Sequence, residues 1–158
     1  MEFIKKLKND LLRDVGVLSR AINYICDVKY KEFNLQKGQY IFLTRIYENP
    51  KINFVDLANM LKVDKTTAIK AVNKLISLGY VNKEVDPTDK RASNLTLTEK
   101  AFDLYDCIIE EENRLIDICL NKFNEDEKKI IREFIKEMSK NIEEEWLEIK
   151  NKGDHNDN

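Results

Sequence analysis

The sequence predicts a mainly α-helical protein with one small β-hairpin, a winged helix-turn-helix between long N- and C-terminal helices. Apolar residues recur every three or four positions over most of the 158 residues, which is the helical period. Only around residues 80–97 does the pattern change to the alternation of strands. Two short helices joined by a tight turn directly precede that stretch, and this order of elements is typical of a winged helix-turn-helix.

The first predicted helix is long and runs from Phe3 to about Phe33. Its apolar stripe is spaced by threes and fours, at Ile4, Leu7, Leu11, Leu12, Val15, Leu18, Ile22, Ile25 and Cys26. Asn34 is a suitable cap for a second helix, which Asn49-Pro50 ends, because the residue before a proline avoids the helical region.

The helix-turn-helix itself is marked by caps. Asn53, followed by Asp56 three residues later, resembles a capping box and starts a short helix. Asp64 is a good cap for the next helix, Lys65–Leu78. Gly79 then stands where a left-handed residue would end that helix.

Two short strands follow, at residues 80–85 and 93–97, joined by the polar turn Asp86-Pro87-Thr88-Asp89-Lys90-Arg91. Thr98 is placed to cap a further long helix that reaches about Leu120. Asn124, with Glu127 three residues on, starts the last helix. We expect residues 1–34 and 99–150 to form dimerisation helices around a winged domain at 35–98, because their apolar stripes exceed what so small a core can cover. Residues 151–158 are expected to be a disordered tail.

The residue inventory argues against an enzyme. The single histidine, His155, lies in the polar C-terminal segment, no phosphate-cradling glycine loop occurs, and the cysteines Cys26, Cys107 and Cys119 lack metal-binding spacing. We therefore expect no cofactor and no metal. No apolar run approaches the roughly 18 residues of a membrane-spanning helix, and the N-terminus lacks a signal-peptide core. These features favour a cytoplasmic protein without a membrane partner.

The net charge of −2 conceals an uneven distribution. Residues 1–50 and 51–100 each carry a net charge of +3, whereas residues 101–158 carry −8. A protein that binds nucleic acid is recognised by where its positive charge lies, and not by its total charge. The acidic balance therefore does not argue against a DNA-binding role for the first hundred residues.

The predicted helix Lys65–Leu78 has a face suited to DNA. At 100° per residue, Ala68, Ala71, Val72 and Leu75 point to one side, Ile69 lies at the boundary, and the opposite side is polar or basic without an acid. Such a face suits the major groove, where lysine can reach guanine or phosphate and asparagine can pair with adenine. We expect the contacts to come from Lys65, Thr66, Thr67, Lys70, Asn73 and Lys74.

The hairpin and its surroundings resemble the MarR family of winged helix-turn-helix transcriptional regulators. The resemblance rests on Asp86–Arg91 followed by Leu95-Thr96-Leu97-Thr98-Glu99-Lys100, on Leu35–Tyr40, and on Val63–Leu75 with Gly79. The order and lengths of the helices also match, so the resemblance covers nearly the whole chain. It implies a homodimeric repressor that binds a pseudo-palindromic site in double-stranded DNA and responds to a small-molecule effector.

The resemblance also assigns roles within the wing. Asp89 would pair with Arg91 and hold the tip of the wing in shape, while Lys90 or Arg91 would project into the minor groove. Lys90 stands where many relatives carry a second arginine, and lysine lacks the planar fork of arginine. Minor-groove contact is therefore expected to depend mainly on Arg91.

The sequence leaves the effector and two other functions open. The tyrosines Tyr24, Tyr30, Tyr40 and Tyr47 could line an effector crevice or simply fill the core. One alternative function is a redox regulator that uses Cys26, Cys107 or Cys119, although all three fall on or near apolar stripes, where inert cysteines are common. The other is a winged helix that binds protein instead of DNA, which would need an apolar recognition helix surface.

Overall fold

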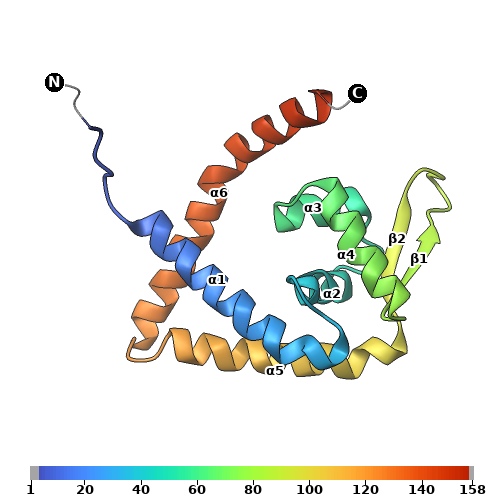
Figure 1. The fold of residues 1–158 in the computed structure, drawn as a ribbon, viewed down its shortest axis with the longest axis horizontal. Helices are drawn as coiled ribbons and strands as arrows, with labels where there is room; N and C mark the ends of the chain where they lie inside the picture. Colours follow the sequence, from blue (N-terminus) through green and yellow to red (C-terminus); the bar gives the residue numbers. More distant parts are fainter. Residues whose placement is uncertain (1–3, 157–158) are drawn as a thin grey trace.

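The computed structural model describes residues 4–156, and Figure 1 shows their arrangement. Six α-helices, two short 3-10 helices and one hairpin follow in the order α1 Leu11–Lys29, η1 Tyr30–Phe33, α2 Gln39–Glu48, α3 Phe54–Leu61, α4 Lys65–Ser77, β1 Val81–Val85, β2 Ser93–Leu97, η2 Glu99–Ala101, α5 Phe102–Cys119 and α6 Glu125–Asn156. The expected fold class is confirmed.

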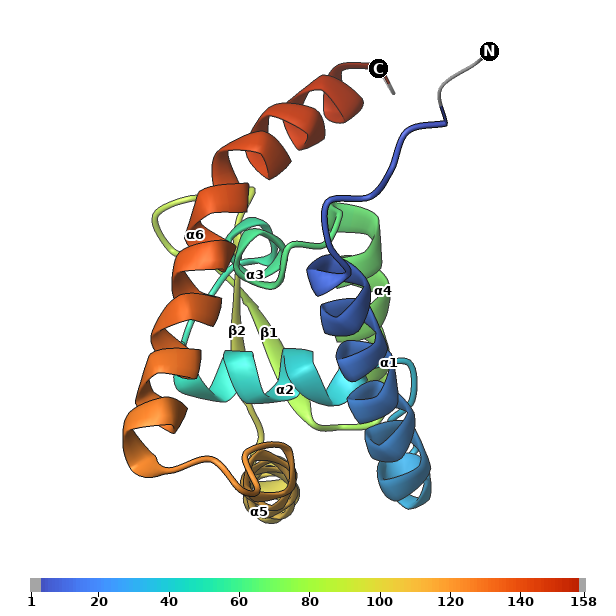
Figure 2. The ribbon, with the colours of Figure 1, turned by 90° about the vertical axis from the view of Figure 1, so that its left-hand side faces the viewer.

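The winged helix-turn-helix lies beside a frame of long helices. Helix α2 packs above α5, and α1 and α6 stand on opposite sides of α2 (Figure 2). The wing projects at the end of the molecule opposite the N-terminus (Figure 1). No helix between residues 4 and 156 is both long and apolar enough to cross a membrane.

The core of the winged domain brings together α2, α3, α4 and the hairpin. Leu43 and Ile46 of α2, Leu57 of α3, Leu75 of α4 and Leu95 of β2 are completely buried. Full burial of such a side chain is worth about 1.5–3 kcal/mol. Apolar residues at helical spacing therefore hold α4 on a rigid support.

The hairpin is antiparallel, with Val81 opposite Leu97 and Val85 opposite Ser93. A bridge between Ile52 and Leu95 adds a third segment to it: the Leu95 amide donates to the Ile52 carbonyl at 3.0 Å. Because Ile52 immediately precedes Asn53, the cap of α3, this bridge fixes the wing against the helix-turn-helix.

The first helix starts later than the sequence predicts. It begins at Leu11 instead of Phe3, which lies outside the described residues, and Ile4 is 90% exposed. The Leu11 amide donates to Asn9 Oδ1 at 3.0 Å, while the Asp10 carbonyl accepts from Asp14. Asn and Asp side chains can bind backbone amides in place of helical hydrogen bonds. The spacing of apolar residues does not show that the helix starts after them.

The expected cap at Asn34 is also wrong. Asn34 adopts a left-handed conformation (φ 57°) and ends η1, whereas α2 begins only at Gln39. Gly38, with φ 71°, precedes α2, and its amide donates to Asp27 Oδ1 at 3.1 Å. The turn is thus anchored to α1 by a contact between segments that local sequence patterns cannot identify.

Three other predicted caps are confirmed. The Asp56 amide donates to Asn53 Oδ1 at 2.8 Å, and the Thr67 amide to Asp64 Oδ1 at 2.7 Å. Asn124 and Glu127 form a reciprocal capping box.

Two features of the C-terminal third differ from the prediction. The Thr98 hydroxyl makes no cap and donates instead to the Gly79 carbonyl at 2.7 Å. Helix α6 continues to Asn156, so the expected disordered tail is wrong as far as that residue. Residues 157 and 158 and the His155 side chain lie outside the described part of the chain.

Candidate nucleic-acid interface

Helix α4 presents the polar face that its sequence predicts. Ala68, Ala71, Val72 and Leu75 are buried against the core, and Ile69 is half-buried. The predicted contact residues are all exposed along the opposite side, namely Lys65, Thr66, Thr67, Lys70, Asn73 and Lys74. The face thus offers ammonium, amide and hydroxyl groups to a partner.

The N-terminal end of α4 is fixed by Asp64. Its carboxylate accepts the Thr67 amide at 2.7 Å and the Thr67 hydroxyl at 2.8 Å, and these hydrogen bonds hold the Asp64 pKa below its ordinary value. One of the predicted contact residues, Thr67, therefore already donates its hydroxyl proton within the chain.

The C-terminal end of α4 is fixed by residues that follow the wing. Gly79 has φ 77°, a conformation that side chains with Cβ rarely adopt. The Lys100 ammonium donates to the Leu78 carbonyl at 2.7 Å and lies 4.9 Å from the centre of the Tyr80 ring. Together with Thr98 on the Gly79 carbonyl, this contact joins the helix, the wing and the start of α5.

The tip of the wing is organised by Asp86. Its Oδ1 atom accepts the Thr88 amide at 2.7 Å, the Thr88 hydroxyl at 2.6 Å and the Asp89 amide at 3.1 Å. These bonds, first of all those from Thr88, hold the pKa of Asp86 below its ordinary value. The sequence marks this segment as a turn, but it does not show that one carboxylate holds most of it.

The expected pairing of Asp89 with Arg91 occurs in a different form. Asp89 Oδ1 accepts the backbone amide of Arg91 at 2.9 Å, and within residues 4–156 no ion pair joins the two side chains. An aspartate carboxylate reaches the backbone amide two residues later more easily than it reaches the end of a long arginine side chain. The Arg91 guanidinium is therefore exposed and available to a partner.

A cleft of about 450 Å³ separates α4 from the wing. Four of the predicted residues, Lys65, Asn73, Asp89 and Arg91, contribute to its lining. Thr66, Thr67, Lys70, Lys74 and Lys90 do not line it. Helix α4 and the wing thus form two walls of one concavity, whose lining carries three cations and the two carboxylates Asp56 and Asp89.

The cleft also contains residues that sequence reasoning missed. Lys83 of β1 lines it, and its ammonium lies 5.3 Å from the centre of the Phe54 ring. Asn53 and Ser93 line it as well. The alternation of side chains along β1 predicts that Lys83 lies on one face of the hairpin. Which face meets α4 depends on the bridge between Ile52 and Leu95, which the sequence does not show.

Comparison with known proteins identifies the family. Residues 35–93 match the family model described as MarR family. The HTH-type transcriptional regulator YybA of Bacillus subtilis (strain 168) is 38% identical over 149 residues, which cover 94% of this chain and 99% of that protein. The chain belongs to the MarR family. It is thus a MarR-family transcriptional regulator, as its motifs predict.

Solved structures of MarR proteins share its fold. A MarR protein from Peptoclostridium difficile is 55% identical with a TM-score of 0.89, over 95% of this chain and 98% of that one. A MarR-family regulator from Listeria monocytogenes, solved in complex with a 26mer DNA, is 36% identical with a TM-score of 0.86, over 94% and 96% of the two chains.

A second hollow in this MarR chain lies among α1, α2, α5 and α6. It has a volume of about 960 Å³. Leu18, Ile22 and Leu115 give it apolar walls, and its basic side chains are Arg45, Lys128, Lys129, Arg132 and Lys136. Glu112 also lines it, and burial raises the pKa of that carboxyl, although Arg45 opposes the rise.

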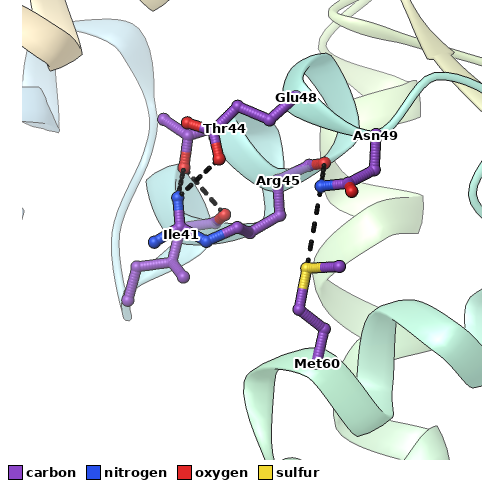
Figure 3. Close-up of polar contacts among 6 residues, drawn as sticks. All are labelled: Ile41, Thr44, Arg45, Glu48, Asn49 and Met60. Atoms are coloured by element: carbon purple, nitrogen blue, oxygen red, sulfur yellow. Dashed lines mark hydrogen bonds and ion pairs between the residues drawn. The ribbon is translucent and has the colours of Figure 1, made fainter. Parts of the chain in front are cut away.

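Arg45 links this cavity to the helix-turn-helix (Figure 3). Its guanidinium donates to Thr44 Oγ1 at 3.2 Å and to Glu48 Oε2 at 3.1 Å. Its carbonyl accepts the Asn49 side-chain amide, which also contacts Met60 Sδ in α3 at 3.7 Å. The cavity wall at Arg45 is therefore connected to α3 through the side chain of Asn49.

The cysteines and tyrosines are unequally placed. Cys26 is buried, and burial raises the pKa of its thiol, whereas Cys119 is exposed and Cys107 is intermediate. Tyr30 and Tyr40 are buried beside each other, with ring centres 5.2 Å apart. Tyr40 also lines the cavity. The remaining two, Tyr24 and Tyr47, are 72% and 44% exposed.

Helices α1 and α6 expose large apolar side chains. On α6, Phe134 is 66% exposed, Ile135 46% and Ile142 60%. On α1, Leu12 is 76% exposed and Val17 59%. Apolar area on this scale usually marks a surface that another chain covers.

Proposed function

We propose that this MarR-family protein is a homodimeric repressor that binds a pseudo-palindromic site in double-stranded DNA, and that it acts in the cytoplasm. The observation that carries the proposal is the basic cleft between α4 and the wing. Lys65, Lys83 and Arg91 line this cleft and outnumber its carboxylates, Asp56 and Asp89. Lys65 and Asn73 belong both to the cleft and to the exposed polar face of α4. Phosphate oxygens are the groups that such a concave cluster of cations attracts.

The division of roles follows from the two walls. Helix α4 would enter the major groove, where Lys70 can reach guanine or phosphate and Asn73 can pair with adenine. The Arg91 guanidinium, which is free of Asp89, would reach the adjacent minor groove together with Lys90. The alternative of a protein-docking winged helix is disfavoured, because the exposed side of α4 offers lysine, threonine and asparagine and not an apolar patch.

Selection of genomic fragments at fixed salt would test the DNA proposal. We expect enrichment of sites with two inverted half-sites about 10 base pairs apart from centre to centre. Lys70→Ala and Asn73→Ala should each reduce the ratio of cognate to random affinity by about five-fold or more, since a base contact contributes about 1–3 kcal/mol. Ser77→Ala, on the same exposed helix side, is the control. Unchanged ratios for both variants would contradict base reading by α4.

The homodimer proposal rests on the exposed apolar residues of α1 and α6. Sedimentation at micromolar concentration should give a dimer, and Ile135→Asp should give monomers, because an unpaired charge would be buried in the interface. Lys140→Asp places the same aspartate on the exposed polar side of α6 and should leave the dimer intact. A wild-type monomer would remove the proposal.

The effector proposal rests on the cavity of about 960 Å³, whose walls are apolar and whose charged groups are mostly basic. Those features fit a small aromatic acid. A ligand at 100 times its dissociation constant should stabilise the fold by about 2.7 kcal/mol, which is measurable by thermal denaturation. Benzoate is a suitable probe, with benzamide as the neutral control, and Arg45→Met should abolish any difference between them. Equal responses to both probes would argue against charge recognition.

A further inference from the structure

The C-terminal half of α6 contacts the turn of the helix-turn-helix. In Figure 2 this part of α6 bends over α3, and the side chains that meet there come from residues far apart in the sequence. Trp146 of α6 is half-buried at the contact, while its sequence neighbours Glu145 and Leu147 are exposed. Trp146 is the only tryptophan in the chain.

Two lysines hold the Trp146 ring. The ammonium groups of Lys62 and Lys150 lie 5.2 Å and 4.8 Å from its centre. Lys62 also donates to Glu143 Oε1 at 2.7 Å, and Lys150 donates to Asn59 Oδ1 at 2.6 Å. Glu143, Trp146 and Lys150 are three and four residues apart, so they share one face of α6. We refer to these five residues as the Trp146 clamp.

The clamp holds the turn between the two helices of the DNA-binding motif. Lys62 ends α3 in a left-handed conformation (φ 56°), and its ammonium also donates to the Asn59 carbonyl at 2.9 Å. Asp64, two residues later, caps α4. Apart from the capping bonds to Asn124 at its own start, the hydrogen bonds and ion pairs that α6 makes with the rest of residues 4–156 all go to Asn59 and Lys62. The clamp is therefore the polar link between α6 and the recognition unit.

We propose that the Trp146 clamp is a positioning device for DNA recognition: it fixes the winged helix-turn-helix relative to α6 and so sets the half-site spacing that the dimer accepts. This inference rests on the proposed homodimer and its DNA site. If α6 belongs to the dimer interface, the orientation of each winged helix-turn-helix relative to its α6 determines the distance between the two copies of α4. Trp146 is in this sense a positioning residue that does not itself contact bases.

Tryptophan fluorescence tests whether the clamp holds in solution without DNA. Quenching by acrylamide should increase in Lys150→Ala, which removes one ammonium from the ring and the bond to Asn59. Lys152→Ala is the matched control, because Lys152 has the same charge and is exposed on the same helix. Equal quenching in both variants and in the wild type would show that the clamp is not formed.

A library of operators with varied half-site spacing tests the positioning role. For Trp146→Ala, the affinity ratio between the best and the next spacing should fall at least about five-fold, which corresponds to the loss of the two exposed cation–π contacts of a single protomer. Trp146→Phe should restore part of the ratio, and Lys152→Ala should leave it unchanged. Circular dichroism and sedimentation would verify that each variant is a folded dimer.

The outcomes separate this inference from the proposed function. If the wild type prefers one spacing and Trp146→Ala keeps the same profile, the positioning role is wrong while the DNA proposal stands. If the wild type binds no site better than random DNA, the proposed function fails and the positioning role fails with it. The quenching comparison still reports in that case whether the clamp exists.

Discussion

Lys83 provides the most direct test of the cleft, because the structure places it there and no sequence motif does. Its side chain lines the cleft, and its ammonium lies 5.3 Å from the centre of the Phe54 ring, which also lines the cleft. If it contacts a phosphate, Lys83→Gln removes two such contacts from a dimer. Each phosphate contact contributes about 0.9 to the slope of log affinity against log salt, so the slope should become about 1.8 less steep.

This change has a measurable consequence. Raising the salt from 50 to 200 mM weakens DNA binding by both proteins. The fold-loss of affinity should be about 12 times smaller for the Lys83→Gln dimer than for the wild type. Fluorescence anisotropy with a labelled operator at four or five salt concentrations would measure both slopes. Lys31→Gln is the charge-matched control, since Lys31 is exposed on η1 and does not line the cleft.

Two results would refute the reasoning. Equal slopes for the wild type and Lys83→Gln would show that Lys83 meets no phosphate. A loss of affinity that is the same at every salt concentration would mean that Lys83 acts through the shape of the wing, by its contact with Phe54, and not through charge.

Two further predictions concern the fold. Gly79→Ala should lower the free energy of unfolding by about 1–2 kcal/mol, because alanine at φ 77° is strained. Urea denaturation would measure this loss. A variant as stable as the wild type would show that the end of α4 relaxes without strain. Cys26 should resist alkylation until the protein unfolds, since it is buried and its thiol pKa is raised by burial. Mass spectrometry with a trace alkylating agent would contradict this if Cys26 reacted as fast as it does in urea.

The sequence predicts most of the fold because the dominant signals are local. Apolar spacing and the caps Asn53, Asp64 and Asn124 define helices within a few residues, and these are the helices that the structure contains. The errors at Asn9 and Asn34 arise where a polar side chain or a left-handed turn overrides that spacing. Such departures depend on contacts that periodicity does not encode.

The candidate site was less predictable than the fold. The polar face of α4 follows from its helical period, but Lys83 joins the cleft only through the bridge between Ile52 and Leu95. Trp146 reads in the sequence as one more apolar position of the last helix, and only the path of α6 brings it to Lys62. Both residues depend on how distant segments pack, which a single sequence leaves open.

The wing offers a comparison in which charge and order predict opposite results. Asp86→Ala and Asp89→Ala each remove one negative charge per protomer, so electrostatics alone predicts equally tighter DNA binding for both. Their hydrogen bonds differ, however. Asp86 accepts two amides and a hydroxyl, whereas within residues 4–156 the Asp89 side chain accepts only the Arg91 amide.

A wing that loses its order before it meets DNA must be ordered during binding, which weakens the complex. We therefore expect Asp86→Ala to bind more weakly than the wild type at both low and high salt. Asp89→Ala should bind more tightly at low salt and like the wild type at high salt, where the charge difference is screened. Because the Asp86 pKa is lowered in the folded wing, its stabilising effect is present above the ordinary aspartate pKa and is lost only as the pH falls through the lowered value. Titrations of a labelled operator near neutral pH thus sample the intact turn. If both variants bind more tightly by the same factor at low salt and converge with the wild type at high salt, the wing needs neither carboxylate for its shape.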